Sequence, residues 1–483
     1  MMPAITMQHW LTKRAELSPN DDALEFIDGR KITFKQLQEK SEIVAKQLAS
    51  AGVNEKSRVA ILSANNLDMI VTIHALSYLG AVAVMLNTRL TNEELTYQLQ
   101  AANTFLLVTT EDLRVKKELD FSNIMTFSEL VKQPLLEIEL VEEISLDDPF
   151  TMMFTSGTTG LPKAVLHTYG NHWWSATGSA LNLGLHDNDK WLLPLPIFHI
   201  GGFSILQRSV IYGMPAFVME KYDAEQFYDV IRNKNITIVS LVTLMLRQLV
   251  ESLGKAELPS HVRCLLLGGG SVPEDLLSVV QDKSLPLFQS YGMTETSSQI
   301  VTLSAQDALR KLGSSGKALF PAQVKVINSQ RDNVGEILVK GPMVMHGYDD
   351  NPKANEESFS DGWLKTGDLG YLDEEGFLYV VERRTDLIIS GGENIYPTEI
   401  ESKLLQIPGV SDAGVYGERD DYWGEVPVAS IVRENDKVTE EIINEILNSS
   451  LASYKIPTKY YFVDTLPRNA SNKLMRHQLK NKN

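Results

Sequence analysis

Hydrophobic and polar positions in the first half of the chain follow a repeated order of helix and then strand. From Ser41 to Ala51 the apolar side chains recur at helical spacing, and the pattern ends at Gly52. The short apolar run from Val59 to Leu62 then predicts a buried strand. The same order returns twice, with helices and strands expected at 69–79 and 81–86 and at 224–233 and 236–241. Alternating helices and strands favour parallel sheets covered by helices, an α/β fold.

The pattern changes at Gly335, where the apolar runs become shorter. GEILVKG and then YLDEEGFLYVVERR predict short strands joined by a tight Glu-Glu-Gly turn, as in a small barrel or a small antiparallel sheet. After Arg383 the chain resumes with TDLIISGG, a helix at 397–405, a strand at 409–416 and a last helix beginning at Glu440. We therefore expect a large N-terminal domain over residues 1–384 and a small α+β C-terminal domain over residues 385–483.

Composition and charge narrow the class of protein. The chain has 483 residues, of which 43% are hydrophobic, so it has ample core for a large globular protein. Its net charge of −17 argues against nucleic acid or an anionic membrane as a partner, and a polyanionic ligand must be held by local groups. The single cysteine, Cys264, excludes an internal disulfide, and neither a signal peptide nor a membrane-spanning stretch is predicted. We expect a cytoplasmic protein with no membrane insertion; a homo-oligomer is compatible with the sequence.

The stretch FTSGTTGLPKA, which follows the apolar run 150–154, has the residue types of a phosphate site. Its glycines let backbone N–H groups turn toward one point, and its hydroxyl side chains and lysine add donors and charge. The spacing differs from that of the P-loop of nucleotide triphosphatases, so a helix-capped phosphate site is not indicated. The alternative is a solvated hairpin loop, and the loop by itself does not decide between the two. The candidate residues are Thr155, Ser156, Gly157, Thr158, Thr159 and Lys163.

Five further blocks occur in a fixed order along the chain. They are YGMTETSSQ at 291–299, GEILVKGP at 335–342, WLKTGDLG at 363–370, ERRTDLIISGGENIYPTEIE at 382–401 and LPRNASNKLMR at 466–476. Together with the glycine-rich loop they resemble the adenylate-forming acyl- and aryl-CoA ligase superfamily. The resemblance implies that superfamily's fold, with a mobile C-terminal domain. It also implies ATP, Mg²⁺ and coenzyme A as ligands, and an acid that is joined to AMP before it passes to the thiol.

The resemblance assigns roles around the phosphates. Thr294 matches the hydroxyl that contacts the α-phosphate, and Glu295 matches the carboxylate that binds magnesium. Lys473 matches the lysine that bridges the acyl carboxylate and the α-phosphate during adenylation. Without the resemblance, Glu295 would be read as an exposed glutamate and Lys473 as a solvated lysine.

A second group of residues matches the adenosine site. The strand 263–267 runs into three glycines, with a predicted capping box of Ser271 and Glu274 behind them. Three glycines exceed what a strand-to-helix turn needs, and close approach of a flat ring explains the excess. By resemblance the adenosine site and part of the acyl pocket comprise Gly268, Gly269, Gly270, Gln289, Ser290, Tyr291, Gly292, Asp368 and Arg383. An ordinary turn, a turn aspartate and an exposed arginine paired with Glu382 or Asp386 are the alternatives.

The second half-reaction requires a different surface, because the thiol must reach the carbonyl beside Lys473. By resemblance Gly391 and Gly392 line the tunnel for the pantetheine arm of coenzyme A once the small domain has rotated near Thr385. Many relatives have Asp or Lys at this pivot, so the threonine leaves open whether a side chain there stabilises one orientation.

One segment indicates which acid is activated, and its sequence is LPLPIFHIGGFSILQRSV. His199 matches a gate between the acyl pocket and the phosphates, and Arg208 follows about two and a half helical turns later. A positive charge does not suit the apolar pocket of a fatty-acyl ligase, but it can pair with the distal carboxylate of a dicarboxylic acid. The alternatives are a packing histidine and a solvent-facing arginine.

The segments GNHWWSATGSALNLG, LLLGGGSVPEDLL and YGMTETSSQIVTLS are most similar to the 2-succinylbenzoate–CoA ligases of bacterial menaquinone biosynthesis. That resemblance places the acid at His199, Arg208, Gly268 and Gly292. The alternatives are a CoA ligase for another aromatic or medium-chain acid, a stand-alone adenylating enzyme, and a nucleotide-binding regulator without catalysis.

Overall fold

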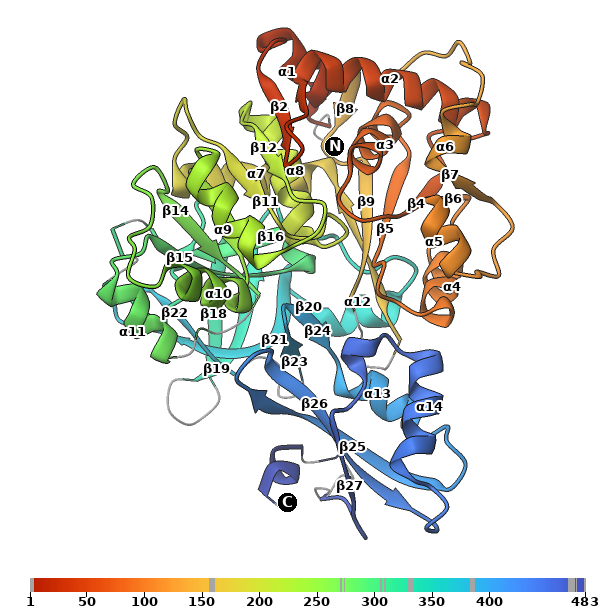
Figure 1. The fold of residues 1–483 in the computed structure, drawn as a ribbon, viewed down its shortest axis with the longest axis vertical. Helices are drawn as coiled ribbons and strands as arrows, with labels where there is room; N and C mark the ends of the chain where they lie inside the picture. Colours follow the sequence, from red (N-terminus) through yellow and green to blue (C-terminus); the bar gives the residue numbers. More distant parts are fainter. Residues whose placement is uncertain are drawn as a thin grey trace.

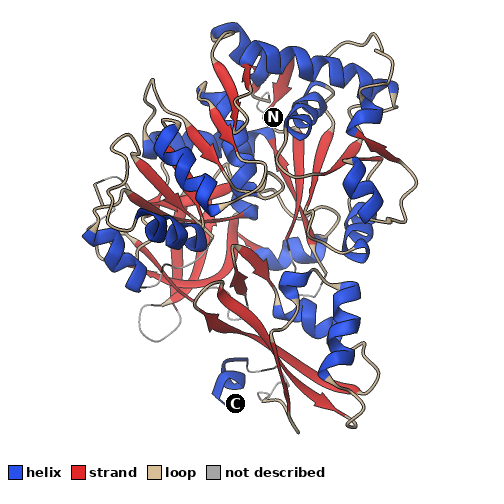
Figure 2. Ribbon diagram, viewed as in Figure 1, coloured by secondary structure: helices blue, strands red, loops and turns tan. Residues whose placement is uncertain are grey.

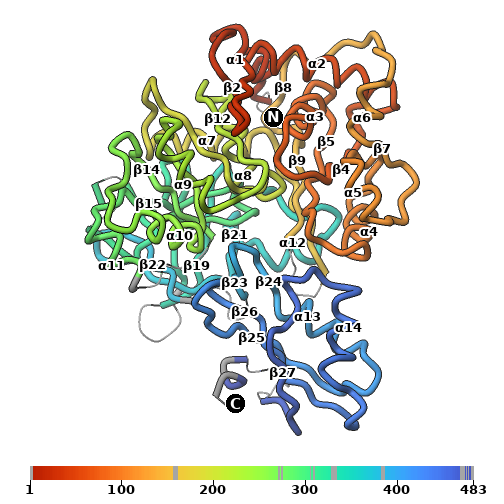
Figure 3. Tube along the Cα trace, in the orientation of Figure 1, coloured from red at the N-terminus to blue at the C-terminus, as the bar shows by residue number. Residues whose placement is uncertain are grey.

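The computed structural model divides the chain into a large N-terminal domain and a small C-terminal domain, which lies at the bottom of Figure 1. The N terminus lies near the top of the large domain, and the C terminus lies at the lower end of the small one (Figure 3). The structure describes residues 4–155, 161–269, 272, 274–304, 306–307, 310–328, 334–382, 387–467, 474 and 476–481.

Two large sheets form the N-terminal domain. The six-stranded sheet has the order β10-β9-β5-β4-β6-β7 and is parallel except for the β9–β10 pair. Its strands are β4 (Arg58–Leu62), β5 (Val82–Leu86), β6 (Leu106–Thr109), β7 (Ile124–Thr126), β9 (Pro149–Thr155) and β10 (Lys163–Thr168). The nine-stranded sheet has the order β17-β16-β15-β14-β13-β11-β12-β2-β3. Its strands are β2 (Asp22–Phe26), β3 (Lys31–Thr33), β11 (Trp191–Leu193), β12 (Ala216–Val218), β13 (Ile238–Leu241), β14 (Cys264–Leu267), β15 (Leu287–Met293), β16 (Ser298–Thr302) and β17 (Lys317–Ala318).

Helices cover these sheets on both faces, as parallel sheets require. One hydrophobic core joins the facing sides of the two sheets through helices α3 and α8. The outer helices lie on the right and left of the domain in Figures 1 and 2, and their apolar faces close two further cores. The helices are α1 (Trp10–Leu17), α2 (Phe34–Ser50), α3 (Leu67–Tyr78), α4 (Asn92–Ala101), α5 (Glu111–Lys116), α6 (Phe127–Leu130), α7 (Tyr169–Leu183), α8 (Ile200–Tyr212), α9 (Ala224–Asn233), α10 (Thr243–Leu253) and α11 (Glu274–Asp282).

The later part of the chain forms smaller sheets. A five-stranded antiparallel sheet completes the N-terminal domain, with β18 (Gln323–Asn328), β19 (Gly335–Lys340), β20 (Phe359–Ser360), β21 (Trp363–Leu372) and β22 (Leu378–Glu382), and with helix α12 (Pro352–Ser358) beside it. The C-terminal domain contains β23 (Ile388–Ser390), β24 (Glu393–Ile395), β25 (Val410–Asp420), β26 (Gly424–Arg433), β27 (Lys459–Phe462), α13 (Pro397–Leu404) and α14 (Glu440–Ser450). The remaining elements are the pair β1 (Thr6–Gln8) and β8 (Glu143–Ser145) and the 3₁₀ turns η1 (Thr294–Thr296), η2 (Ser453–Lys455) and η3 (Arg476–Asn481).

The expected elements are present, with shifted ends. The helix at 224–233 has its predicted bounds, and the antiparallel strands after Gly335 and the α+β C-terminal domain are confirmed. The helix expected to begin at Ser41 begins at Phe34, because Thr33 and Gln36 form a capping box. The strand expected to end at Tyr416 runs to Asp420, because a long hairpin with β26 holds its second half. The predicted boundary at 384/385 falls outside the described residues and stays a prediction.

No helix in the described ranges combines the length and apolar character needed to span a bilayer.

Candidate active site

A cavity of about 1220 Å³ lies between the two domains and collects most of the predicted site. Its N-terminal wall is built largely from segments that follow the carboxyl ends of parallel strands β11, β13, β14 and β15. Open α/β sheets bind ligands at this edge because successive loops diverge there. Its C-terminal wall includes Leu387 and residues 390–394.

The predicted phosphate and magnesium residues lie in the turn η1. Glu295 is buried, with 4% of its surface exposed, and its Oε1 accepts a 2.8 Å hydrogen bond from the Tyr348 hydroxyl. The backbone N–H of Met345 donates to the Glu295 carbonyl at 2.9 Å. Thr294 and Glu295 both line the cavity. The reading of Glu295 as an exposed surface residue is therefore excluded.

Thr155 of strand β9 and Lys163 of strand β10 lie directly opposite each other in the antiparallel pair, one on each side of the glycine-rich loop. The loop thus joins two antiparallel strands, which agrees with the expectation that it is no helix-capped P-loop. Thr155 lines the cavity, and the buried Lys163 ammonium lies 4.9 Å from the centroid of the Tyr348 ring. Tyr348 therefore contacts both Lys163 and Glu295, and the sequence contained no pattern that singled it out.

The adenosine candidates separate by strand alternation. Ser290 and Gly292 line the cavity from β15, whereas Gln289 and Tyr291 are not among its lining residues. Successive side chains of a strand point to opposite faces, which accounts for the division. Tyr291 is buried instead, and its hydroxyl donates to Asp368 Oδ2 at 2.7 Å. Asp368 lines the cavity and is 7% exposed, so it is a buried, oriented acceptor rather than a surface turn residue.

The three glycines of this wall differ in how strongly the described structure requires glycine. A Cβ at Gly292 would lie 2.1 Å from the Ser298 carbonyl oxygen, so the fold itself excludes a side chain there. At Gly268 the nearest described atom, Ser290 Oγ, would lie 3.5 Å from a Cβ, which is ordinary contact. Gly269 has φ +88°, a conformation that favours glycine. The described protein atoms thus leave room for a methyl group at Gly268.

Arg208 is a buried cation at the cavity wall. It lies on helix α8 with 1% of its surface exposed, and its guanidinium carbon is 5.3 Å from the centroid of the Trp191 ring. Its Nε and Nη2 have no hydrogen-bond partner among the described residues. Burial lowers the pKa of the Arg208 guanidinium. The solvent-facing alternative is excluded, and a buried donor of this kind fits an anionic ligand.

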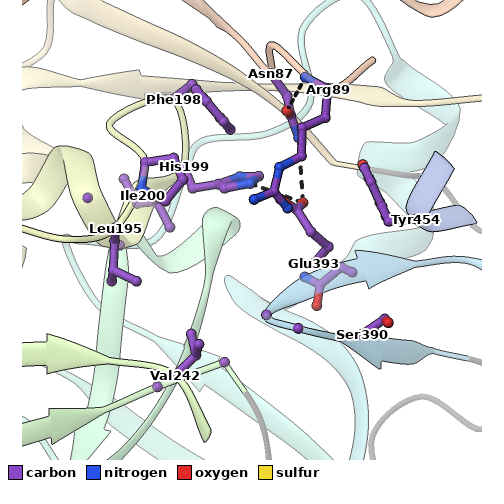
Figure 4. A pocket seen from close by; sticks show the side chains of 18 of the residues that line it. Asn87, Arg89, Leu195, Phe198, His199, Ile200, Val242, Ser390, Glu393 and Tyr454 are labelled. Carbon is purple, nitrogen blue, oxygen red and sulfur yellow. Dashed lines mark hydrogen bonds and ion pairs between the residues drawn. The ribbon is translucent and has the colours of Figure 1, made fainter. Parts of the chain in front are cut away.

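His199 stands at the N-terminus of α8 and reaches across to the C-terminal domain. Its Nε2 lies 3.2 Å from Glu393 Oε2, and Arg89 Nη1 donates to Glu393 Oε1 at 3.1 Å. Figure 4 shows both side chains converging on Glu393. The His199 side chain is 43% exposed, so it is no core residue. The sequence reading passed over Glu393 and Arg89, although Glu393 directly follows the two glycines at 391 and 392.

Gly391 and Gly392 line the same cavity beside Glu393. Their φ values are +58° and +89°, and a Cβ would lie 2.8 Å from the Trp423 ring at Gly391 and 3.1 Å from Val242 at Gly392. The backbone conformation favours glycine at both positions, and close neighbours add to this, from within the C-terminal domain at Gly391 and from the N-terminal domain at Gly392.

Several predicted residues lie outside the described part of the chain. They are Ser156, Gly157, Thr158, Thr159, Gly270, Ser271, Arg383, Thr385 and Lys473. Their predicted roles stay predictions.

The residues present fit a magnesium ion that is bound together with nucleotide. Among the described residues no group of three or more His, Cys, Asp or Glu side chains could hold a metal ion by itself. Magnesium prefers one or two carboxylates with phosphate oxygens and waters, and the buried Glu295 carboxylate at the cavity wall suits that role.

Known proteins resemble the chain over almost its whole length. A 2-succinylbenzoate–CoA ligase of Oceanobacillus iheyensis is 52% identical over 480 residues, which cover 98% of this chain and 99% of the relative. A double mutant of o-succinylbenzoate CoA synthetase from Bacillus subtilis, bound with the product analogue OSB-NCoA, has a TM-score of 0.96, with 45% identity over 99% of both chains. The same enzyme in complex with the acyl-adenylate intermediate OSB-AMP has a TM-score of 0.77, with 46% identity over 99% of this chain and 98% of that one.

The two TM-scores differ although identity and coverage hardly change. The difference therefore reflects another placement of the same fold's parts, and the domains of this chain are arranged as in the product-analogue complex. Residues 11–349 match the AMP-binding enzyme family, and residues 399–473 match the C-terminal domain of AMP-binding enzymes. The cavity is lined by residues of both matched regions and of the segment between them, and the chain belongs to the AMP-binding enzyme family.

Proposed function

We propose that the protein ligates 2-succinylbenzoate to coenzyme A, with conversion of ATP to AMP and pyrophosphate, as a step of menaquinone biosynthesis. The relatives of this name align with the whole chain, and the related structures contain the acyl-adenylate and a product analogue of this reaction. A related enzyme has also been solved with ATP and a magnesium ion. Because ATP and coenzyme A are cytoplasmic metabolites, we also propose a cytoplasmic location.

In the first step a carboxylate oxygen of the acid bonds to the α-phosphorus of ATP and pyrophosphate leaves. The hydroxyl of Thr294 contacts the α-phosphate, and the glycine-rich loop with Lys163 binds the outer phosphates. Glu295 holds magnesium, which offsets the negative charge of the phosphates when it is bound. Lys473 bridges the two reacting anions. The shared cavity of Thr294 and Glu295 supports this assignment.

A second group of residues binds the adenosine part of the nucleotide. Asp368 accepts hydrogen bonds from the ribose hydroxyls, and the Tyr291 hydroxyl keeps its carboxylate oriented. The backbone at Gly268 and Gly269 approaches the adenine ring and the acyl chain. The free space at Gly268 supports this role, because the described protein atoms would tolerate a methyl group there.

The observation that carries the choice of acid is the buried Arg208, whose Nε and Nη2 have no hydrogen-bond partner among the described residues. A dicarboxylic acid whose succinyl carboxylate is adenylated has a second carboxylate that is left over on the ring. That carboxylate pairs with the guanidinium and satisfies the donors that lack a described partner. An acid without a second carboxylate would leave the buried cation unpaired.

In the second step the sulfur of coenzyme A bonds to the acyl carbon, the bond from that carbon to the adenylate oxygen breaks, and AMP leaves as the thiol proton is lost. Gly391 and Gly392 leave room for the pantetheine arm. His199 is held by Glu393 of the C-terminal domain, beside the path into the acyl pocket. The product-analogue arrangement of the domains supports this assignment.

The direct test is formation of a CoA thioester from 2-succinylbenzoate with ATP and Mg²⁺, beside benzoate and octanoate at equal concentrations. We expect thioester from 2-succinylbenzoate in large excess over both monocarboxylic acids. Equal or faster turnover of benzoate or octanoate would refute the proposed acid, and absence of pyrophosphate release with every acid would refute adenylation itself.

A further inference from the structure

A buried histidine outside the cavity contacts the phosphate turn from behind. His167, on strand β10, is fully buried, and its Nε2 lies 2.7 Å from the carbonyl oxygen of Thr294. The same carbonyl accepts the N–H of Ser297 at 3.0 Å, which closes the turn η1. The predicted α-phosphate residue is therefore anchored through its main chain to the six-stranded sheet.

The hydrogen bonds fix the direction in which this anchor donates. A carbonyl only accepts, so His167 carries its proton on Nε2. Burial lowers the pKa of His167 to about 4, so the imidazole is neutral and its Nδ1 is an acceptor. The Thr151 hydroxyl, 3.4 Å away, donates to that Nδ1 and itself accepts from His172 Nε2 at 2.8 Å.

The chain of hydrogen bonds ends at His172, which packs against helix α8. His172 is buried beside the ring of Phe203 on helix α8, with 5.0 Å between ring centroids. Burial, and with it the nearby charge of Arg208, lowers the pKa of His172 and keeps this imidazole neutral. His167 and Thr151 thus each have one donor role and one acceptor role, so the direction of these bonds cannot reverse without a change of tautomer.

We propose that His167 is a positioning residue for adenylation, which holds the Thr294–Glu295 turn in place against the α-phosphate and magnesium. This inference rests on the proposed function. The turn carries both predicted phosphate-site residues in consecutive positions, so a shift of the Thr294 carbonyl moves both of them. A structural role in packing would require only an apolar ring, whereas a donor aimed at this carbonyl restrains the turn.

The test compares His167→Leu with His167→Gln, whose terminal amide offers a donor at the place of Nε2. Pyrophosphate exchange with 2-succinylbenzoate reports adenylation, and transfer of a presynthesised acyl-adenylate to coenzyme A reports the second step. For His167→Leu we expect kcat of exchange to fall roughly a hundredfold, as when a reacting group is misplaced by about 1 Å. We also expect a higher Mg²⁺ requirement for exchange and a second step close to wild type. His167→Gln should recover most of the exchange.

His74→Leu is the matched control, because His74 is an equally buried imidazole on helix α3 and burial lowers its pKa to about 4 as well. It should leave the ratio of the two half-reactions unchanged. The proposal would be overturned if His167→Leu lost both steps equally or kept wild-type exchange. It would also be overturned if His167→Gln did not recover exchange.

If His167→Leu does not fold, Thr151→Val provides the test, since it removes the hydroxyl that orients His167 at nearly constant volume. A selective loss of exchange in Thr151→Val supports the proposal, and unchanged exchange overturns it. Absence of exchange in the wild type would instead refute the proposed function.

Discussion

His199 of the N-terminal domain and Glu393 of the C-terminal domain face each other across the cavity, with 3.2 Å between Nε2 and Oε2. Glu393 is buried, and burial by itself would raise its pKa. The charges of His199, Arg89 and Lys455 outweigh burial and hold the pKa below its ordinary value. The carboxylate is therefore ionised at neutral pH and joins the two domains in the arrangement of the product-analogue complex.

Glu393→Gln should impair the second half-reaction selectively. The amide keeps the size of the side chain and removes the charge that attracts His199 and Arg89, so the thioester-forming arrangement loses stability. We expect transfer of a presynthesised acyl-adenylate to coenzyme A to fall about tenfold, which corresponds to about 1.4 kcal/mol. Pyrophosphate exchange should stay near wild type, and an equal fall in exchange would contradict the assignment.

The same pair predicts a dependence of stability on pH. A carboxyl whose folded pKa is lowered contributes stability above its unfolded pKa, about 4.3, and loses it as the pH falls through the folded value. The difference in Tm between wild type and Glu393→Gln should therefore be full at neutral pH and disappear in more acidic solution. Calorimetry of both proteins across this range checks the sign, and a difference that grows on acidification would refute it.

A second contact between the domains is a buried cluster around Lys455. The Lys455 ammonium lies 2.6 Å from Glu94 Oε1 on helix α4 and 2.7 Å from Glu399 Oε1 on helix α13. Glu94→Gln keeps the capping box that this residue forms with Thr91 and removes the charge that crosses the interface. Because Lys455 retains Glu399, the loss should stay below the roughly 3–5 kcal/mol of an orphaned buried charge.

We therefore expect Glu94→Gln to slow thioester formation about tenfold, or about 1.4 kcal/mol, while pyrophosphate exchange is retained. Glu93→Gln is the matched control, because Glu93 pairs with Lys403 at an exposed site on the same helix end. Exposed pairs contribute about 0–1 kcal/mol, so this variant should stay within roughly a factor of five of wild type. Equal effects of the two variants would contradict a specific role for the buried cluster.

Arg208→Leu should separate acid recognition from stability. Loss of hydrogen bonds to a charged group costs about 1.5–3 kcal/mol, so KM for 2-succinylbenzoate should rise roughly ten- to a hundredfold while KM for ATP stays unchanged. Because the guanidinium is buried with Nε and Nη2 unpartnered among the described residues, its removal should also raise Tm in the absence of ligands. An unchanged KM for the acid would remove Arg208 from the substrate site.

Gly268→Ala should affect ligand binding, whereas Gly292→Ala should affect thermal stability. The methyl group at position 268 has room beside Ser290, so Tm should stay near wild type while KM for ATP or for the acid rises. At position 292 the methyl group would collide with the Ser298 carbonyl, so Tm should fall. Thermal unfolding and steady-state kinetics of both variants check this. Unchanged kinetics in Gly268→Ala would refute the assignment of a ligand contact at Gly268.

The sequence by itself determined the architecture and the identity of most candidate residues. Helical and strand periodicity is a local property, so it predicted the alternation of elements and the change of pattern after Gly335. The ordered blocks identified Thr294, Glu295 and Asp368 as candidates. Each of these residues lies within a short contiguous segment, so its neighbours in the sequence are enough to recognise it. Element ends shifted where a partner decided them, as at Asp420, which pairs with Gly424 across a hairpin.

Only the tertiary structure decided which side chains face the cavity and what supports them. Arg208 was compatible with solvent until the packing of helix α8 between the two sheets buried it. His167, Tyr348 and Glu393 are separated in sequence from the groups they contact, and no local pattern records a contact between distant segments. Their roles follow from long-range packing and from one orientation of the domains, because burial and hydrogen-bond geometry exist only once those segments have come together.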